Sequence, residues 1–512
     1  MQYAHDSIMP AKVKLNVVEG PMKGREFVFD EHDTFLFGRT NDCHICLPDD
    51  GQVSRHHFIL EANPPDARVR DLGSLNGTYV NGAKQGGRAQ GETPEEGAQR
   101  VYPEVDLKNG DRINIGESTM TVSVEIPVTC ADCGGEIGPG QAKEGGRHGV
   151  DAYCRPCWEV GYLTMKPAKD RFGKGPPPLV AQPVRCKKCG KDAAKEVGNA
   201  RRGDYICENC RHQAGSDPLA ILLELLRGAG KGAAAAGAPK IAGYEVERML
   251  GKGGFGAVYL ARRTADNQRV AVKVMLSRVA VDENNRQMFL REIETTKTLR
   301  HDHIVPLLES GSAGGAFYFI LDFCDGGSVD GLMARKGGKL KLAEAAPIML
   351  QSLDGLAFAH ARQFIHRDLK PANILLAGGE GRWTAKVSDF GLAKNFQRAG
   401  FSGMTVTGSY AGTPPFMPRE QVTNFKYIKP ATDVWSMAAT FYNLLTGQVP
   451  RDFQRGKDPI EIILRGRIVP IRERDPALPK NFAGVIDAAL ANDPKDRFAD
   501  AAVFKRALEG VL

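Results

Sequence analysis

The feature that most constrains the fold is a series of four short motifs, which occur in a fixed order between residues 251 and 391. The first has the form G-x-G-x-x-G-x-V over residues 251–258, and its glycines would let backbone amides lie against a phosphate. The second, VAVK, ends at Lys273, whose ammonium can hold phosphates from the end of an apolar strand. Glu292 follows on a stretch of helical pattern and could pair with Lys273. Glycine-rich turns are common, so the succession of motifs carries the argument.

Two further motifs supply the polar groups that phosphoryl transfer requires. HRDLKPAN at residues 366–373 places Asp368, Lys370 and Asn373 on one loop, and DFG at residues 389–391 adds Asp389. Asp368 can orient a hydroxyl and accept its proton, while Lys370 can offset charge on the γ-phosphate. Asn373 and Asp389 offer the oxygen ligands that Mg²⁺ prefers. A surface cluster of charges would explain any one motif, but not all of them in this order.

In this order the motifs resemble the eukaryotic-like protein kinase family, and the resemblance extends from Tyr244 to the C-terminus. It implies a two-lobed α+β domain that transfers the γ-phosphoryl group of ATP to protein hydroxyls with Mg²⁺ as cofactor. The string DLKPAN resembles the Ser/Thr class. The implied catalytic residues are Lys273, Glu292, Asp368, Lys370 and Asn373. The implied ATP-binding residues are Leu250, Gly251, Lys252, Gly253, Gly254, Phe255, Gly256, Ala257, Val258, Lys273 and Asp389, and the implied magnesium ligands are Asn373 and Asp389.

The resemblance also implies an activation segment over residues 389–420. Thr405 and Thr407 are similar to threonines that bacterial Ser/Thr kinases autophosphorylate. A phosphate there would add about two negative charges and neutralise Arg367, which precedes the catalytic aspartate. We therefore expect Thr405 and Thr407 to be regulatory phosphosites.

The chain departs from the family pattern in two places. Glu420 resembles the glutamate that closes the activation segment and pairs with an arginine, here Arg497. The family usually has Ala-Pro before this glutamate, whereas this chain has Pro418 and Arg419, which puts the geometry of substrate docking in question. The second departure is Thr296, where the family prefers a larger apolar residue.

The first 126 residues have a different pattern. Alternation of apolar and polar residues from 12 to 17, further short apolar runs and Asn-Gly turns predict an all-β sandwich. Gly38-Arg39, the SRHH string at 54–57 and two Asn-Gly pairs resemble the forkhead-associated (FHA) domain, which reads phosphothreonine. The resemblance implies phosphopeptide contacts from Arg39, Ser54, Arg55 and Asn76. Cationic and amide donors suit a phosphate dianion.

Eight of the eleven cysteines form four C-x-x-C pairs in one zone of the chain. Pairs at this spacing favour structural zinc, because each turn offers two thiolates to a tetrahedral ion. The simple interpretation is two zinc-ribbon-like modules of four thiolates each, and a single cross-braced unit using alternate pairs stays open. We expect metal removal to spare the kinase lobes. The candidate ligands are Cys130, Cys133, Cys154 and Cys157 in the first module, and Cys186, Cys189, Cys207 and Cys210 in the second.

Length and composition fit a multidomain globular protein. A chain of 512 residues is too long for one core, and its 42% hydrophobic content excludes wholesale disorder. The net charge of +7 is scattered, so nucleic acid is not an expected partner, and no apolar run approaches the roughly 20 residues that span a bilayer. Without a signal-peptide pattern, we expect a cytoplasmic protein. The expected order is an FHA-like domain at 11–126, zinc module 1 at 128–162, a linker at 163–184, zinc module 2 at 185–212, a linker at 213–243 and the kinase domain at 244–512.

The expected partners are ATP, protein substrates with Ser or Thr hydroxyls, and a phosphothreonine ligand. That ligand would be another protein or the chain's own activation loop, which the Gly/Ala-rich tether at 228–239 would allow to reach the FHA-like loops. Two rival interpretations are a pseudokinase scaffold that only binds, and a zinc-dependent nucleic-acid regulator. Intact Lys273, Asp368, Asn373 and Asp389 argue against the first, and the few basic residues near the cysteines argue against the second.

Overall fold

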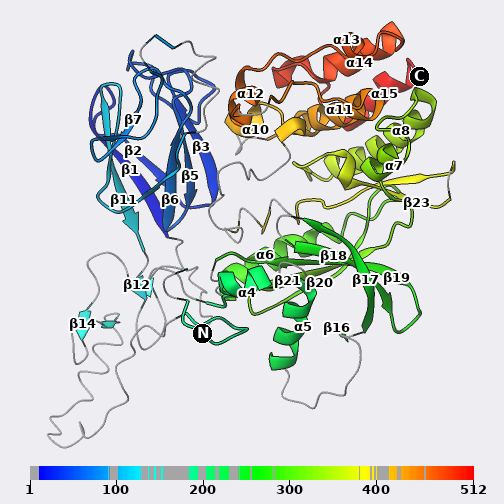
Figure 1. Ribbon diagram of the computed structural model, residues 1–512, viewed down its shortest axis with the longest axis horizontal. Helices are drawn as coiled ribbons and strands as arrows, with labels where there is room; N and C mark the ends of the chain where they lie inside the picture. The colour runs from blue at the N-terminus through cyan, green and yellow to red at the C-terminus, as the bar shows by residue number, and fades with distance from the viewer. Residues whose placement is uncertain are drawn as a thin grey trace, which may run out of the picture.

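The computed structural model shows a sandwich at the N-terminus and a two-lobed unit at the C-terminus (Figure 1). The residues that the structure describes are 11–89, 91–92, 102–126, 128–129, 136–137, 143–145, 151–153, 184–193, 196, 203–213, 218–229, 240–241, 243–253, 256–279, 281, 283–379, 381–392, 395–396, 399, 414–423, 428–454 and 457–512. None of the helices in these segments has both the length and the apolar character needed to cross a lipid bilayer.

The N-terminal sandwich consists of two sheets that enclose one apolar core. Val13, Leu15 and Val17 of the first strand point into this core, because side chains on alternate positions of a strand share one face. One sheet has the order β2(Glu26–Phe29), β1(Lys12–Glu19), β11(Ser118–Glu125), β10(Arg112–Ile115), β7(Thr78–Val80), β8(Ala83–Lys84). The other has the order β4(Ile45–Cys46), β3(Asp33–Gly38), β5(Phe58–Asn63), β6(Asp66–Asp71), β9(Val105–Leu107). Within this second sheet, the rings of Phe37 on β3 and Phe58 on β5, which are paired across the two strands, stack with centroids 4.4 Å apart.

The smaller lobe of the C-terminal unit, called the N-lobe, is an antiparallel sheet with one long helix beside it (Figure 1). Its strands run in the order β16(Lys240–Ile241), β17(Tyr244–Gly253), β18(Gly256–Arg263), β19(Arg269–Leu276), β21(Ala316–Asp322), β20(Leu307–Ala313), and the helix is α6(Glu283–Thr296). Strand β19 is buried on both faces, so its two sets of side chains enter two different apolar clusters. One cluster, which we call the inner cluster, also contains residues from the start of the activation segment. The other, which we call the outer cluster, also contains residues of the second cysteine-rich segment.

The larger lobe, called the C-lobe, is mainly helical. The helix α11(Pro430–Thr446) forms its centre, starting with proline in its first turn and ending at Gly447 with φ of 69°, a left-handed conformation that suits glycine. Trp435 of α11 is buried and donates its indole N–H to the carbonyl of Leu490 at 3.0 Å. The other elements are β22(Gly327–Ser328), α7(Val329–Arg335), α8(Leu342–His360), η2(Pro371–Asn373), β23(Ile374–Ala377), β24(Thr384–Val387), η3(Pro414–Phe416), α10(Glu420–Thr423), α12(Pro459–Arg465), α13(Ile471–Arg474), α14(Lys480–Ala489), η5(Pro494–Asp496) and α15(Ala501–Glu509).

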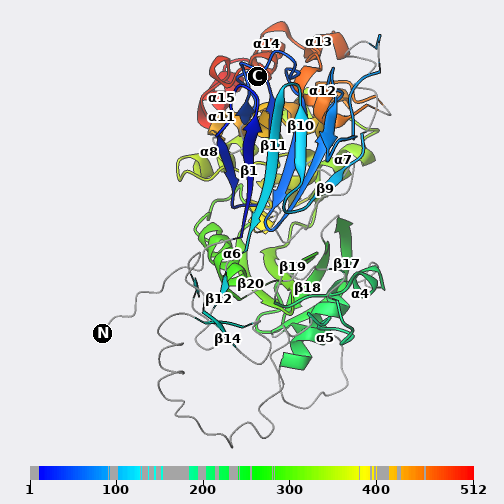
Figure 2. The ribbon, with the colours of Figure 1, turned by 90° about the vertical axis from the view of Figure 1, so that its left-hand side faces the viewer.

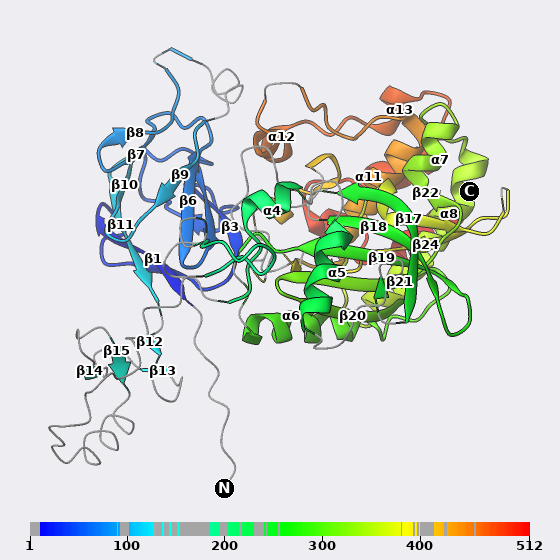
Figure 3. The same cartoon turned by 60° about the horizontal axis from the view of Figure 1, so that its bottom comes forward.

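The second cysteine-rich segment packs on the outer face of the N-lobe sheet (Figure 3). It contains α4(Glu208–Gln213), and the helix α5(Pro218–Ala229) follows it. Leu219, Ile221, Leu222 and Leu223 are buried in one cluster with residues of β18 and β19. The stretch expected to be a linker, 213–243, thus contains a helix whose apolar residues find a partner surface that the sequence does not reveal. The first cysteine-rich segment shows two short strand pairs, β12(Val128–Thr129) with β13(Glu136–Ile137) and β14(Lys143–Gly145) with β15(Asp151–Tyr153).

The N-terminal sandwich lies against the C-lobe, as two views show (Figures 1 and 2). Strand β3 contacts α10, and the apolar cluster between them includes Leu36 of the sandwich and Val422 of α10. These two parts of the chain are separated by more than 370 residues. The sandwich is therefore placed beside the end of the activation segment.

Candidate active site and phosphopeptide site

The glycine-rich motif forms the hairpin of β17 and β18. Gly251 pairs with Val258 and Gly253 with Gly256, while Gly254 and Phe255 lie outside the described residues. A Cβ atom on Gly256 would lie only 1.7 Å from the carbonyl oxygen of Val274, so glycine is required there. The side chain of Ala257 faces the outer cluster with α5, and only its backbone is available to a nucleotide. Leu250 and Lys252, which are both exposed, precede the turn.

Lys273 is bound to the aspartate of the DFG motif. Its Nζ donates to Oδ2 of Asp389 at 2.7 Å. Burial opposes ionisation of Asp389, but the positive charge and hydrogen bond of Lys273 outweigh it and hold the pKa of this carboxyl below its usual value. Although both residues are described, no hydrogen bond or ion pair joins Lys273 to Glu292, whose side chain is exposed on α6. The expected Lys273–Glu292 pair is therefore absent from this conformation.

An aromatic side chain of the activation segment explains the position of α6. Phe396 is fully buried in the inner cluster of the N-lobe, with its ring centroid 5.8 Å from that of Phe289 on α6 and 5.6 Å from that of Phe317 on β21. Leu392 enters the same cluster. The start of the activation segment thus occupies the space beneath α6. Thr405 and Thr407 lie outside the described residues.

The catalytic loop brings its three predicted side chains together. Nζ of Lys370 donates to Oδ2 of Asp368 at 2.9 Å. Nδ2 of Asn373 donates to the backbone carbonyl of Asp368 at 2.7 Å and lies 3.3 Å from its Oδ2. These bonds fix the Asp368 carboxylate beside a cation, in the arrangement that a base for hydroxyl substrates requires.

A buried carboxylate holds the backbone of this loop. Asp433 accepts hydrogen bonds from the backbone N–H of His366 at 2.7 Å and of Arg367 at 2.9 Å, and His360 bonds the same carboxylate at 2.9 Å. Burial opposes the charge on Asp433, but the His360 hydrogen bond and the neighbouring histidine charges outweigh it and lower its pKa. Arg367 has φ of 70°, a strained conformation that these bonds stabilise. Asp433 thus anchors the catalytic loop.

The end of the activation segment is fixed from both sides. The guanidinium of Arg497 donates to both carboxylate oxygens of Glu420, at 2.5 and 2.9 Å, as predicted. Arg451, which the sequence analysis missed, donates to the carbonyl of Met417 at 3.1 Å, and burial lowers its pKa to about 10. Arg419, one of the two departures, forms an ion pair with Asp42 of the sandwich. The substitution at this position therefore has a partner in another part of the chain.

Three loops of the sandwich bring the predicted phosphopeptide residues to one end. The backbone N–H of Arg39 donates to the carbonyl of Ser54 at 3.0 Å, so the loops that carry them are adjacent. The hydroxyl of Ser54 accepts from the N–H of Leu75 at 2.9 Å, and Asn76 donates to the carbonyl of Gln52 at 2.8 Å. Arg39, Arg55 and Asn76 are exposed. The predicted residues thus form one polar end of the sandwich, open to a ligand.

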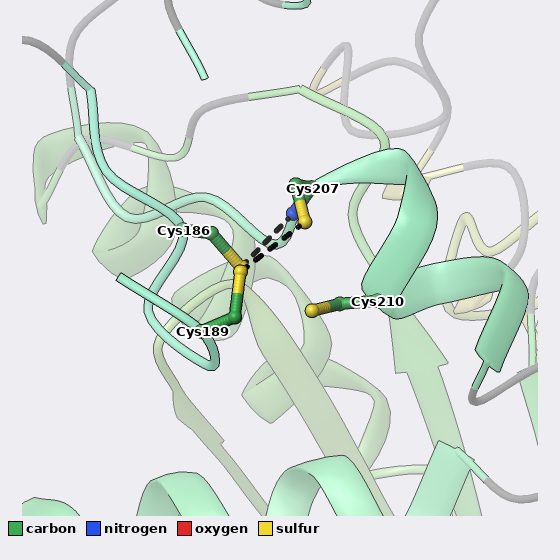
Figure 4. Close-up of side chains that lie close together, drawn as sticks. All are labelled: Cys186, Cys189, Cys207 and Cys210. Atoms are coloured by element: carbon green, nitrogen blue, oxygen red, sulfur yellow. Dashed lines mark hydrogen bonds between the residues drawn. The ribbon is translucent and has the colours of Figure 1, made fainter. Parts of the chain in front are cut away.

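The second set of four cysteines forms one cluster (Figure 4). The four sulfur atoms lie within 4.8 Å of one another, and those of Cys189 and Cys207 are 3.7 Å apart. A tetrahedral zinc ion at about 2.3 Å from each sulfur would set the sulfurs about 3.8 Å apart, so the set fits zinc. Gly190, with φ of 72°, allows the tight turn after Cys189. The first set, Cys130, Cys133, Cys154 and Cys157, lies outside the described residues.

The functional residues that sequence reasoning missed are Phe396, Arg451 and the Asp42–His56 pair. The only available signal was the departure at Arg419, which marked this position without revealing its partner. Phe396 and Arg451 match no motif, and their roles follow from tertiary packing alone.

Two lobes, a glycine-rich hairpin and the Asp368 loop define the class of a protein kinase fold, and comparison with known proteins agrees. The family model described as "Protein kinase domain" matches residues 244–508, which is 265 of the 512 residues. The chain therefore belongs to the protein kinase family. A second model, described as "FHA domain", matches residues 35–116 within the sandwich.

Several similar proteins are Ser/Thr kinases by name. PknJ of Mycobacterium tuberculosis is 34% identical over 278 residues, which are 53% of this chain and 46% of PknJ. PknF of the same species is 34% identical over 271 residues, which are 52% of this chain and 56% of PknF. The chain thus spans about half the length of the relatives it matches. The crystal structure of the M. tuberculosis PknI kinase domain is 28% identical and covers 54% of this chain and 99% of that one, with a TM-score of 0.41.

Proposed function

We propose that this protein is a Ser/Thr protein kinase that transfers the γ-phosphoryl group of ATP to protein hydroxyls. The observation that carries the proposal is the catalytic loop, in which Asp368, Lys370 and Asn373 are hydrogen-bonded to one another. In this arrangement Asp368 would accept the hydroxyl proton of the substrate while Lys370 offsets charge on the transferred group. A pseudokinase scaffold has no need for this set of residues.

The metal and nucleotide positions support the same function. Asp389 and Asn373 present oxygen ligands of the kind that magnesium prefers, and Asp389 is kept ionised by Lys273. Magnesium bound there would neutralise phosphate charge. Lys273, which now contacts Asp389, would hold the α- and β-phosphates once Glu292 moves inward on α6. The residues of 250–258 would cover the phosphates with their backbone.

The state described here is assigned to an unphosphorylated, inactive form. Phe396 packs against Phe289 of α6, and the exposed Glu292 makes no ion pair with Lys273, which contacts Asp389 instead. Phosphorylation of Thr405 or Thr407 would draw the activation segment toward Arg367, remove Phe396 from the inner cluster and allow the Lys273–Glu292 pair to form.

We assign two further roles to the accessory regions. Arg39, Ser54, Arg55 and Asn76 would bind phosphothreonine, since they form one exposed polar end of the FHA domain. Cys186, Cys189, Cys207 and Cys210 would hold one structural zinc ion, because four thiolates leave no coordination position open to water. The first four cysteines would bind a second zinc ion.

A comparison of two variants tests the activity. Asp368→Asn keeps the size of the side chain but removes the base, so transfer to a peptide should fall about a hundredfold or more. ATP affinity, measured by calorimetry, should stay near the wild-type value. Lys273→Met should lower transfer as strongly by weakening phosphate positioning. If Asp368→Asn transfers phosphate at the wild-type rate, the assigned role of the loop is wrong.

A further inference from the structure

The interface between the FHA domain and the C-lobe contains two ion pairs. Asp42 of the FHA domain bonds Arg419, and His56 contacts the same Asp42 carboxylate at 3.1 Å. On the next part of the surface, Arg70 of β6 pairs with Asp458, which also accepts the N–H of Ile460 as the N-cap of α12. The side chains of Arg70 and Asp458 are only 2% and 4% exposed. Removing one member of a buried pair leaves an uncompensated charge, so this contact selects one docked arrangement.

Apolar side chains fill the space beside these pairs. The FHA side supplies Leu36, Ile59 and Leu72, and the C-lobe side supplies Met417 and Ile463. Asp42 and Arg419 are separated by 377 positions along the chain, with the two cysteine-rich segments between them. So long a connection does not impose this contact, and the charges and apolar groups of the surfaces select it.

The FHA side of the interface belongs to the same loops that would bind phosphothreonine. Asp42 lies three residues after Arg39, and His56 directly follows Arg55. The hydroxyl of Thr40 donates to the carbonyl of Arg55 at 2.9 Å and ties the two loops together. One side of this pair of loops therefore contacts the C-lobe of the kinase domain, while Arg39 and Arg55 stay exposed.

The kinase side belongs to the segment that docks substrate. Arg419 directly precedes Glu420, which closes the activation segment, and Met417 lies two residues before Arg419. Both ends of the contact are thus recognition elements: a phosphate-binding loop on one domain and a substrate-binding segment on the other.

We propose that the docked FHA domain makes this kinase selective for polypeptides that already carry a phosphothreonine, which the loops at Arg39 and Arg55 hold while a second hydroxyl on the same polypeptide enters the active site. This inference rests on the proposed function and adds the substrate class. Its physical basis is effective concentration: a ligand held beside the active site meets the catalytic loop far more often than a free peptide does. A phosphorylated activation loop of a second copy is one member of this class.

The test compares primed and plain peptides. Each pair has the same acceptor serine and a threonine at a graded distance, phosphorylated in one member only. For wild-type full-length protein, kcat/KM should be about tenfold or more higher for the primed peptide, with an optimum spacing. Arg39→Ala should abolish this ratio by removing phosphate binding.

Variants of the buried pair separate docking from phosphate binding. Arg70→Ala lies outside the phosphothreonine loops, and Asp458→Asn keeps a good helix cap while removing the charge. Both should bring the ratio and its spacing optimum close to those of a freely tethered domain, and the double variant should be no worse than either single variant. Arg68→Ala is the matched control, because Arg68 is on the same strand and pairs with Asp106 and Glu104 inside the FHA domain. It should keep the wild-type ratio.

Thermal unfolding and phosphopeptide affinity of each variant exclude loss of folding or of the pocket as the cause. A ratio of one in wild-type protein that phosphorylates plain peptide and binds the phosphopeptide would overturn the selectivity. An unchanged ratio in folded Arg70→Ala and Asp458→Asn would overturn the role of docking. Failure to phosphorylate any peptide would instead contradict the proposed kinase activity.

Discussion

The two lobes of the kinase domain each contact an accessory region, but the two junctions differ in chemistry. On the N-lobe, the second cysteine module and α5 share one continuous apolar cluster with β18 and β19. On the C-lobe, the FHA domain is joined through two ion pairs beside a smaller apolar patch. At this second junction, Oδ1 of Asp42 and Nε of Arg419 are buried without a hydrogen-bond partner among the described residues. Burial of apolar surface favours a stable, permanent interface at the N-lobe junction, whereas incompletely paired charges favour an interface that can open at the C-lobe junction.

Because one junction is apolar and the other contains ion pairs, we expect them to respond differently to metal removal, mutation and acid. The cysteine module and α5 should unfold together with the N-lobe. The FHA domain should separate from the C-lobe without unfolding either partner.

Metal removal should have the largest effect. Zinc binding supplies much of the folding energy of small cysteine modules, about 10 kcal/mol or more in isolated ones. Because the module shares its core with the N-lobe, a chelator should lower the Tm of the kinase domain and reduce phosphoryl transfer, contrary to the expectation from sequence that the lobes would be spared. Elemental analysis should find about two zinc ions per chain. Metal-free protein with an unchanged Tm would contradict the shared unit.

Truncation inside the shared cluster should have the next largest effect. Leu222 is fully buried between α5 and the sheet. Leu222→Ala should lower the free energy of unfolding by about 2–5 kcal/mol, through lost burial and the cavity left behind. The control is Glu224→Ala, an exposed position on the same helix that should change it by about 0.5 kcal/mol or less. Equal effects from both would mean that α5 is not part of the N-lobe core.

Acid should act on the FHA domain through Asp42. The hydrogen bond from His56, aided by Thr40 and Arg419, holds the pKa of Asp42 well below its usual value. Since the folded-state pKa is depressed, this contribution is complete above the unfolded-state pKa of about 3.9 and is lost as the pH falls through the lower folded-state pKa. His56 and Thr40 belong to the FHA domain itself, so most of this contribution stabilises the FHA fold and only the part due to Arg419 acts across the junction. The free energy of unfolding of the FHA domain should therefore be constant from about pH 7 to 5 and decrease below about pH 4. In Asp42→Asn this decrease should be smaller, and an identical decrease would exclude Asp42 as its cause.

Local motifs and strand patterns were predictable from sequence, whereas contacts between domains were not. The bonds among Asp368, Lys370 and Asn373 lie within six residues, so one loop motif specifies them. The pair of Lys273 with Glu292 depends on the position of α6, which Phe396 changes through packing that no motif encodes. The residues of α5 form an apolar run in the sequence, but their burial depends on the N-lobe sheet, which the sequence does not place beside them.

Arg419 is intermediate between the local motifs, which the sequence predicts, and the contacts between domains, which it does not. In the sequence it departs from the family pattern, and this departure puts the geometry of substrate docking in question. Its partner, Asp42, carries no sequence signal of its own, because a lone aspartate in a loop is common. Only the fold brings the two charges together.

The most direct test of the account is phosphoryl transfer by the purified wild-type protein. With γ-labelled ATP and Mg²⁺, the account predicts label on the protein and on a generic Ser/Thr substrate, with mapped sites that include Thr405 or Thr407. Thr405→Ala/Thr407→Ala protein should transfer label to substrate about tenfold or more slowly, because the activation segment would keep Phe396 beneath α6. A wild-type protein that binds ATP but labels neither itself nor any substrate would contradict the central claim and would support a binding scaffold instead.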